Sequence, residues 1–427
     1  MKTLAAILVG KIIFIAIRVL KLGGGSAAPG HFALKIEPDL VSKLARQIPE
    51  NVIITGTNGK TTTAKLLALF AKDQNIKVLQ NSTGSNMERG IASKLVEECS
   101  LFGRIKEVDL GVWESDEASF NKLAIKLRPK IIIFLNAARD QLDRYGEFDT
   151  LVSEWRETLQ KLDFKPLVLV NADDASTLSL ASYHASQTFG ADKKIVQSEK
   201  ESMGKINKDF EAIQISDKGL NGFAFTIKTR KNSFMATFPI SGLYHVYSFM
   251  AAFAAGTNLN LNPLKMLESV KRYQPAFGRV EQLKIGGKDV VISLIKNPSG
   301  ATAVFETVKS QLKTNDRILL ALNDNLADGT DVSWIWDAGF EELRVKSEEC
   351  RVFCTGARAE DLALRLKYAG FDEKQLTVES NIASALDSAL KGLDGKLFIM
   401  PTYTALLEFQ KILASKGVKE HYWKDKN

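Results

Sequence analysis

Short β-branched runs alternate with helical patterns through much of the chain. Residues 51–55, NVIIT, precede a glycine-containing turn, and residues 60–70 then repeat apolar side chains at helical spacing. Two further apolar runs, in KEVDLGVWESDEASF (106–120) and PKIIIFLNAARDQLDRYGEFD (129–149), also end in polar loops. Such alternation is typical of a mainly parallel sheet with helices on both faces. The sequence therefore predicts an α/β fold with ligands at the carboxyl ends of the strands.

The N-terminal segment MKTLAAILVGKIIFIAIRVLKLGGGSAAPG is mostly apolar but carries Lys11 and Arg18 within the apolar run. Their seven-residue spacing returns both cations to one face of a helix, which favours an interfacial helix over a membrane-spanning one. A packed first helix of the globular domain, or a signal peptide or anchor, would also give a long apolar run. All three interpretations stay open at this point.

Composition narrows the class of protein. A chain of 427 residues is long enough for two or three domains, and 45% apolar with 25% charged residues is ordinary for a soluble protein. The net charge of +7 suits an anionic partner, but it is spread along the chain and does not predict a nucleic-acid-binding surface. Three cysteines without a C-x-x-C pair and four histidines without an H-E-x-x-H motif predict neither disulfides nor a zinc site. We expect an intracellular protein.

The segment GTNGKTT lies between the first predicted strand and its helix, which is the position of a phosphate-binding loop. It has fewer residues between the glycines than the common G-x-x-x-x-G-K-[ST] motif. Backbone N–H groups of the loop would surround phosphate oxygens, the lysine would reach the terminal phosphates, and a threonine hydroxyl would ligate Mg²⁺ at the helix N-terminus. The predicted ATP-binding residues are Gly56, Thr57, Asn58, Gly59, Lys60, Thr61 and Thr62.

An acidic turn follows the next predicted strand, in VWESDEA. Glu114 would stand at the carboxyl end of that strand, where a nucleotide enzyme needs a second Mg²⁺ contact or a group that orients water. The alternative is a solvated acidic turn, above all for Asp116 and Glu117. We predict Thr61 and Glu114 as Mg²⁺ ligands, with Glu114 also a candidate catalytic residue.

GTNGKTT, VWESDEA and N-x-x-RDQLDRYGE together resemble the Mur ligase superfamily, whose ATP-dependent enzymes activate a carboxylate as an acyl phosphate and then attack it with an amine. The closer similarity is to its MurT branch, the ligase subunits of lipid II isoglutaminyl synthases. The segments that carry it are NSTGSNMERGIAS (81–93), LIKNPSGATAVFE (294–306), LNDNLADGTDVSWIWDAGFE (322–341), CTGARAEDLALRLKYAGF (354–371) and MPTYTALLE (400–408).

This resemblance implies three parts. Residues 1–38 would form an apolar, basic helix and linker, residues 39–282 a Mur ligase-type P-loop ATPase domain with a parallel sheet, and residues 283–427 a Rossmann-like α/β domain. Relatives often carry a four-cysteine zinc ribbon in the middle domain, but no cysteine lies in the corresponding insertion, about 176–240. We expect a small hairpin at 222–238 there instead.

Other site residues follow from the resemblance. His245 and Ser248 replace two asparagines of a helix start that faces the adenine, although a buried core histidine is an equal alternative. Arg279 matches an arginine that contacts ATP, and Lys296 matches a polar residue near the phosphates. Two departures favour ammonia over an amino acid as the amine: Asp140-Gln141 replaces an Asp-His pair, and Trp155-Arg156 replaces a lysine.

The resemblance implies amidation of the α-carboxylate of D-glutamate in the stem peptide of lipid II, giving D-isoglutamine. Rival hypotheses are an amino-acid-adding ligase of the murein or folylpolyglutamate type and a nucleotide-binding scaffold without turnover. The lipid substrate implies a cytoplasmic protein with peripheral contact at the inner face of the membrane.

The chain has no G-x-C-x-G elbow, and Cys354 is predicted to be a buried thiol at a strand end. A partner subunit would therefore supply the cysteine and histidine that release ammonia, and the resemblance implies a GatD-like glutamine amidotransferase. The resemblance also implies that the C-terminal domain lends that pair an aspartate, with Asp337 the first choice and Asp331 the second. Asp324 and Asp328 would cap turns. Of Trp334 and Trp336, we expect one in the core and one at the interface.

Overall fold

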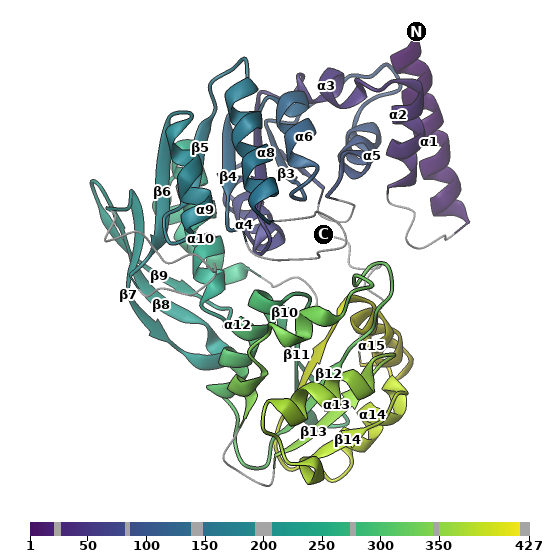
Figure 1. The fold of residues 1–427 in the computed structure, drawn as a ribbon. Coiled ribbons are helices and arrows are strands. Elements are labelled where there is room, and N and C mark those ends of the chain that lie inside the picture. Colours follow the sequence, from purple (N-terminus) through teal and green to yellow (C-terminus); the bar gives the residue numbers. More distant parts are fainter. Residues whose placement is uncertain are drawn as a thin grey trace.

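The computed structural model describes residues 1–20, 27–81, 86–137, 148–192, 207–273, 279–344 and 350–418. Within them, the strands form two sheets, one of nine strands and one of six. Figure 1 shows the larger sheet, built from the first part of the chain, above the smaller one. This is an α/β fold, as the alternation of strand and helix patterns predicts.

The larger sheet has the order β2-β3-β1-β4-β5-β6-β7-β8-β9. Neighbouring strands from β2 to β7 are parallel, whereas β8 pairs antiparallel with both β7 and β9. The central strand β1 carries Val52, Ile53 and Ile54, which are fully buried, as expected for a parallel strand covered on both faces. The bounds are β1 (Glu50–Thr55), β2 (Val78–Gln80), β3 (Leu110–Glu114), β4 (Ile131–Phe134), β5 (Leu167–Asn171), β6 (Ser186–Ala191), β7 (Phe210–Asp217), β8 (Phe223–Thr229) and β9 (Ser233–Phe238).

Helices cover this sheet on two sides, so it has two hydrophobic cores. Because side chains alternate along a strand, Val52 and Ile54 pack with α4, α10 and α11, whereas Ile53 packs with α3, α5, α6 and α8. The bounds are α3 (Leu40–Ala45), α4 (Lys60–Lys72), α5 (Glu88–Glu98), α6 (Phe120–Leu127), α8 (Phe148–Lys161), α9 (Ala175–Leu178), α10 (Tyr244–Asn258) and α11 (Pro263–Ser269), with 3-10 turns η1 (Ser179–Ser182), η2 (Gly219–Asn221) and η3 (Val270–Arg272).

The N-terminal helices α1 (Lys2–Val19) and α2 (Ala28–Ile36) pack side by side at one edge of this domain and against α5 (Figure 1). Gly30 sets the distance between α2 and α5, because a Cβ there would lie 2.1 Å from the Arg89 carbonyl oxygen. Its N–H donates to Ser93 Oγ at 2.8 Å. Across the described residues, no helix combines the length and the apolar character needed to cross a membrane.

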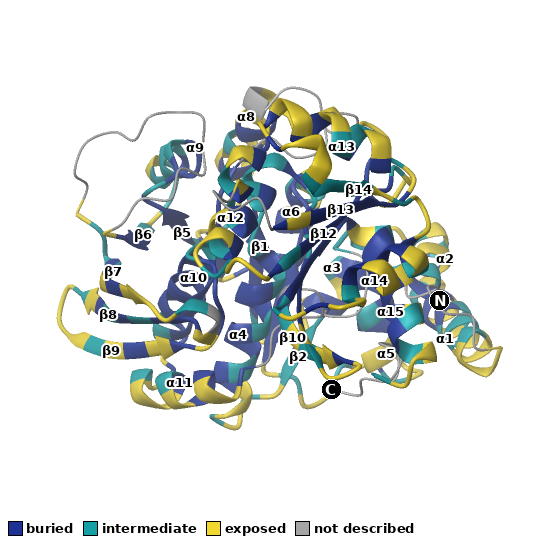
Figure 2. Cartoon of the chain, turned by 90° about the horizontal axis from the view of Figure 1, so that it is seen from below, coloured by how far each residue is buried: buried dark blue, intermediate teal, exposed yellow. Residues whose placement is uncertain are grey.

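The smaller sheet has the order β10-β11-β15-β12-β13-β14, with β10 antiparallel to β11 and all other pairs parallel. Helices again cover both faces, and its central strands β11, β15, β12 and β13 are largely buried, dark blue in Figure 2. The strands are β10 (Arg279–Ile285), β11 (Lys288–Ser293), β12 (Arg317–Ala321), β13 (Arg351–Thr355), β14 (Leu376–Val378) and β15 (Leu397–Pro401). The helices are α12 (Pro298–Lys309), η4 (Ser333–Trp336), η5 (Phe340–Leu343), α13 (Ala359–Tyr368), η6 (Glu373–Gln375), α14 (Ile382–Leu390) and α15 (Tyr403–Ser415).

Two details concern the expected division of the chain. The hairpin expected at 222–238 is confirmed as β8 and β9, but it extends the main sheet instead of forming a separate insertion. The second sheet begins at Arg279, slightly before the expected start of the C-terminal domain at residue 283. The division at 38/39 and 282/283 itself stays a proposal.

Gly30→Ala should destabilise the protein, because the added methyl group collides with the backbone of α5. A helical alanine alone would stabilise by about 1 kcal/mol, whereas a forced shift of packed helices costs about 1–3 kcal/mol. We expect a net loss in the free energy of unfolding by denaturant titration. His31→Ala is the control, since it also introduces alanine into α2 but at an exposed position, and it should not destabilise the protein. A gain in stability for Gly30→Ala would contradict the close-packing argument.

Candidate functional site

The loop between β1 and α4 has two glycines that its surroundings require. Gly56 has φ 129° and Gly59 has φ 91°, both in the region that disfavours other residues. A Cβ on Gly56 would lie 2.8 Å from the Asn136 carbonyl oxygen, and one on Gly59 would lie 2.7 Å from Ser248 Oγ. The loop is therefore held closely between the end of β4 and helix α10.

Asn136, two residues after β4, binds this loop through three hydrogen bonds. Its carbonyl oxygen accepts from Thr57 N at 3.0 Å, its Oδ1 accepts from Asn58 N at 2.8 Å, and its Nδ2 donates to the Asn58 carbonyl oxygen at 2.9 Å. This role was missed in the sequence, although Asn136 begins the motif N-x-x-RDQ. An amide is suited to this position because it donates and accepts at once.

Lys60 is buried at the start of α4, with its ammonium group folded back over the loop. Nζ donates to the carbonyl oxygens of Gly56 at 2.5 Å and Thr57 at 3.3 Å, and it pairs with Glu117 Oε1 at 3.2 Å. A buried cation held by acceptors on one side is well placed to neutralise a phosphate.

The first turn of α4 fits an anion as well. Gly59 is its N-cap and offers no side chain to the helix end, and Thr63 N makes the first backbone bond, to the Gly59 carbonyl oxygen at 2.9 Å. The N–H groups of Lys60, Thr61 and Thr62 therefore have no acceptor within the helix. Together with the helix dipole, they form an anion-binding end.

Thr61 and Glu114, the two predicted Mg²⁺ ligands, are in contact: Thr61 Oγ1 donates to Glu114 Oε2 at 2.8 Å. The backbone of Glu114 is fixed by Asn81, whose amide donates to its carbonyl oxygen and accepts from its N–H, both at 2.9 Å. Among the described residues, no group of three or more His, Cys, Asp and Glu side chains could hold a metal. One carboxylate and one hydroxyl nonetheless suit Mg²⁺, which takes its remaining ligands from phosphates and water.

Asp116 and Glu117 do not form a solvated acidic turn, because they are only 4% and 3% exposed. Asp116 Oδ1 accepts from Ser119 N at 2.8 Å and so shapes the entry to α6. Glu117 is the counter-ion of Lys60, and its carbonyl oxygen accepts from Trp155 Nε1 at 3.1 Å. The alternative of a solvated turn is therefore wrong for these residues, and Glu117 joins the site.

The loop also contacts the second domain, through Asn58. Its Nδ2 donates to Ser299 Oγ at 3.1 Å, and its Oδ1 accepts from Asn297 Nδ2 at 3.3 Å. Asn297 is the N-cap of α12, accepting from Gly300 N at 2.8 Å. The beginning of α12 therefore lies against the loop. Lys296, half-buried, immediately precedes this cap.

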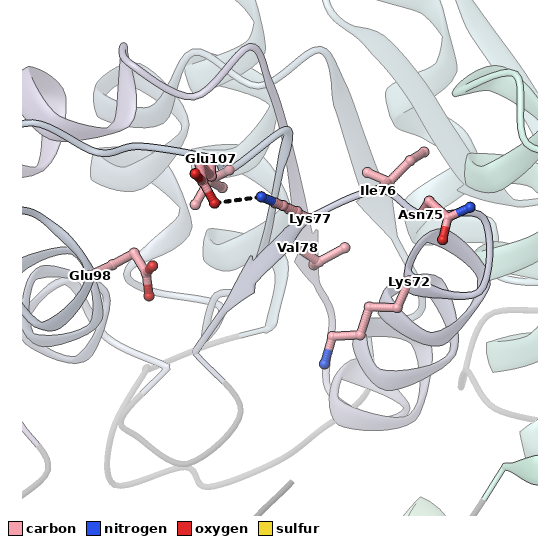
Figure 3. A pocket seen from close by; sticks show the side chains of 8 residues that line it. Lys72, Asn75, Ile76, Lys77, Val78, Glu98 and Glu107 are labelled. Atoms are coloured by element: carbon pink, nitrogen blue, oxygen red, sulfur yellow. Dashed lines mark hydrogen bonds and ion pairs between the residues drawn. The ribbon is translucent and has the colours of Figure 1, made fainter.

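A surface hollow lies at the other end of α4 and is separate from this site (Figure 3). Lys77 and Glu107 form an ion pair at its edge, at 2.5 Å. The hollow lies beside the beginning of β2, whereas Lys60 and Glu114 stand at the carboxyl ends of their strands. Its lining residues are Lys72, Asn75, Ile76, Lys77, Val78, Glu98, Glu107 and Val108.

The acidic segment after β12 has its aspartates in different environments. Asp328 is buried and accepts from the N–H of Thr404, at 2.7 Å, and from its hydroxyl, so it holds the start of α15. Asp324 lies 3.7 Å from Arg358. Asp331 is exposed and accepts from Ser333 N at 2.8 Å, and Asp337 is exposed at the end of η4.

The two tryptophans of this segment differ. Trp334 is half-buried against the core of the C-terminal domain, as expected for one of the pair. Trp336 is 48% exposed and packs edge-on against Tyr368, with ring centroids 5.5 Å apart. Trp336, Tyr368 and Asp337 are therefore all exposed in one part of the C-terminal domain.

Comparison with known proteins identifies the family. The Mur ligase middle domain family matches residues 54–256, and the MurT ligase C-terminal family matches residues 294–406. The chain is 32% identical to a lipid II isoglutaminyl synthase subunit MurT from Staphylococcus aureus strain COL, over 90% of this chain and 91% of the relative. It is 30% identical to the MurT subunit from Streptococcus pneumoniae strain R6, over 93% and 94%.

The chain belongs to the MurT family. Solved Mur ligases share its fold at lower identity. MurF from Acinetobacter baumannii superposes with a TM-score of 0.70 at 16% identity, over 91% of this chain and 80% of that one. Folylpolyglutamate synthase from Mycobacterium tuberculosis superposes with a TM-score of 0.64 at 14% identity, over 89% and 94%.

Within the MurT family fold, the positions at which this sequence is expected to differ from other Mur ligases lie in different environments. Trp155, where amino-acid-adding relatives are expected to carry a lysine, is fully buried against Phe134 and holds the Glu117 carbonyl oxygen. His245 is fully buried at the start of α10, and its ring packs against those of Phe238 and Tyr244. Asp140, Gln141 and the side chain of Arg279 lie outside the described residues.

The three cysteines of this MurT-family chain are buried, Cys354 completely. Burial raises the pKa of the Cys354 thiol to about 12 and that of Cys350 to about 11. Burial also raises the pKa of Cys99. At neutral pH all three therefore remain thiols, which are poor nucleophiles.

Asn136→Ala should weaken nucleotide binding about tenfold or more, because two side-chain hydrogen bonds to the loop are lost, at about 1 kcal/mol each. Titration with a fluorescent ATP analogue would measure the dissociation constant. Asn232→Ala, at an exposed turn between β8 and β9, is the matched control and should bind as the wild type does. An unchanged dissociation constant for Asn136→Ala would contradict the role of Asn136 in shaping the loop.

Proposed function

We propose that this chain is the synthetase subunit of a lipid II isoglutaminyl synthase. It amidates the α-carboxylate of D-glutamate in the lipid II stem peptide, with consumption of ATP, and leaves D-isoglutamine. The observation that carries the proposal is the cluster of Lys60, Thr61 and Glu114 at an open helix end, in a chain that aligns with MurT subunits over nine-tenths of its length. The reaction class is that of an ATP-dependent carbon–nitrogen ligase.

The proposed nucleotide site uses the loop from Gly56 to Thr62. The N–H groups in the first turn of α4 bind phosphate oxygens, and Lys60 turns from the loop carbonyls toward the terminal phosphate. Thr61 and Glu114 hold Mg²⁺, which when bound neutralises charge on the phosphates. Arg279 and Lys296 add positive charge from the hinge and the second domain, whereas the full burial of His245 favours its alternative as a core histidine.

The proposed chemistry has two steps. An oxygen of the substrate carboxylate attacks the γ-phosphorus and the bond to ADP breaks, which gives an acyl phosphate. Ammonia then attacks the acyl carbon, the bond to the phosphate oxygen breaks, and nitrogen loses a proton as the amide forms. Lys60 stabilises negative charge on the transferred phosphate, and Glu117 keeps Lys60 in place between turnovers.

The ammonia comes from a GatD-like glutamine amidotransferase subunit. The buried thiols of this chain support the assignment, because a glutaminase nucleophile needs an accessible thiolate. Asp337 orients the catalytic histidine of that partner, and Trp336 anchors the interface. Asp331, which is also exposed in the same segment, is the second choice. The complex works at the inner face of the cytoplasmic membrane, where the lipid substrate lies.

Lys60→Ala should reduce amidation by about 10²- to 10³-fold with either glutamine or ammonium chloride, because stabilisation of the transferred phosphate is lost. Amide formation on lipid II would be followed by mass spectrometry, with and without the partner. Lys72→Ala removes a cation from the exposed far end of the same helix and should retain activity. Equal activity of Lys60→Ala and wild type would exclude the proposed phosphate site.

Asp337→Asn should retain ammonium-driven amidation and lose glutamine-driven amidation, because only the partner's histidine loses its carboxylate. The ratio of the two rates is the measurement. Asp331→Asn tests the second candidate, and Asp324→Asn is the control within the same segment. If Asp337→Asn and Asp331→Asn both keep the wild-type ratio, neither residue serves the partner; an equal loss of both activities would contradict the division into two sites.

A further inference from the structure

The face of α1 that points away from the protein is apolar. Apart from Lys2 and Arg18, every exposed residue of this helix is aliphatic: Leu4, Ala5, Leu8, Ile12, Ile15, Ala16 and Val19. The five large side chains follow one another at intervals of three or four residues, so they form one stripe. Their exposed fractions run from 46% at Leu4 to 72% at Val19. A surface helix normally has charged and polar residues on its outward face.

The opposite face of α1 already makes the contacts that the fold needs. Ala6, Ile7 and Gly10 are buried, and a Cβ on Gly10 would lie 2.8 Å from Val96 Cγ1 of α5. Figure 1 shows α1 at the edge of the molecule, with α2 beside it. Figure 2 shows exposed positions, in yellow, along this helix. The described residues therefore leave about half or more of each large side chain of the stripe uncovered and available to another surface.

A second apolar element adjoins α1. The turn after α5 approaches the helix closely, since a Cβ on Gly103 would lie 2.9 Å from Ile7 Cδ1. This turn carries Leu101 and Phe102, which are 60% and 81% exposed. Two large hydrophobic side chains on a turn that touches the packed face of α1 thus add exposed apolar surface near the helix.

The charged residues of α1 itself are all positive. Lys11 and Arg18 lie along one flank of the helix and Lys2 lies at its start, while α1 contains no acidic residue. Lys11 Nζ donates to the Glu97 carbonyl oxygen at 3.2 Å, and the Arg18 guanidinium lies 5.9 Å from the centre of the Phe14 ring. Cations beside an aliphatic face match the phosphate groups and acyl chains of an anionic bilayer surface.

We propose that α1, with Leu101 and Phe102, forms a membrane-docking surface that lies in the interface of an anionic lipid bilayer. The helix lies along the bilayer surface, the stripe enters the acyl boundary, and the flanking cations remain at the level of the lipid phosphates. Only the purpose of docking rests on the proposed function: docking holds the ligase at the surface from which the lipid-linked stem peptide projects.

Sedimentation of the full-length chain with vesicles of phosphatidylglycerol tests this proposal. We expect the wild type to bind these vesicles, to bind phosphatidylcholine vesicles less, and to dissociate as sodium chloride screens the cations. The triple variant Leu8→Asp/Ile12→Asp/Ile15→Asp should bind phosphatidylglycerol about tenfold or more weakly, since three charges would enter the acyl boundary. Met235→Asp/Leu264→Asp, at positions 87% and 67% exposed on other elements, is the control and should bind as the wild type does.

Two further measurements distinguish bilayer docking from self-association and from a failure of the proposed function. Size-exclusion chromatography would detect a second copy of the chain on the stripe; a wild-type dimer that the triple variant abolishes, without vesicle binding, would overturn the proposal. Wild type that stays in the supernatant with phosphatidylglycerol would do the same. Wild type and triple variant should amidate a stem-peptide substrate without a lipid chain at equal rates. If neither protein amidates this substrate, the result counts against the proposed function and not against docking.

Discussion

The phosphate-binding loop depends on a close approach that only glycine permits. Gly59 lies against Ser248 of α10, and Gly56 lies against the backbone of Asn136. The loop therefore has its shape only when β4 and α10 are both in place. These elements are 78 and 189 residues from the loop in sequence, so the site is a product of the complete domain. Helix α4, which follows directly, then has its uncapped N-terminus fixed in direction.

The buried ion pair of Lys60 and Glu117 keeps a positive charge beside the phosphate-binding loop. An unpaired buried ammonium would be costly, because a charge loses its hydration there. Glu117 and the two loop carbonyls provide acceptors for Lys60, and the indole N–H of Trp155 holds the backbone of Glu117. Trp155 is itself fixed among Phe120 and Phe134. Amino-acid-adding relatives are expected to carry a lysine at this position. In this chain, Trp155 stands there and supports Glu117, the counter-ion of Lys60.

Elements with local sequence signals could be predicted from the sequence. Site residues whose partners lie far away in the sequence could not. GTNGKTT and the β-branched run before it are contiguous, as is the hairpin formed by β8 and β9. Asn81 and Asn136 act on residues 33 and 78 positions away, and an isolated asparagine in a polar loop carries no sign of such a partner. Glu117 was missed for the same reason: an acidic turn is usually solvated, and burial of this one follows from the helix that covers it.

Helix α12 contacts both segments to which chemistry is assigned. Its first residues contact Asn58 of the phosphate loop through Ser299. One turn farther along, Thr302 Oγ1 accepts a hydrogen bond from Gly339 N at 2.9 Å, two residues beyond Asp337. A helix transmits position along its axis because its backbone bonds resist stretching. The nucleotide loop and the aspartate assigned to the partner's site are therefore held in register by one rigid element. A displacement of Asn58 that moved α12 along its axis would also move the backbone beside Asp337.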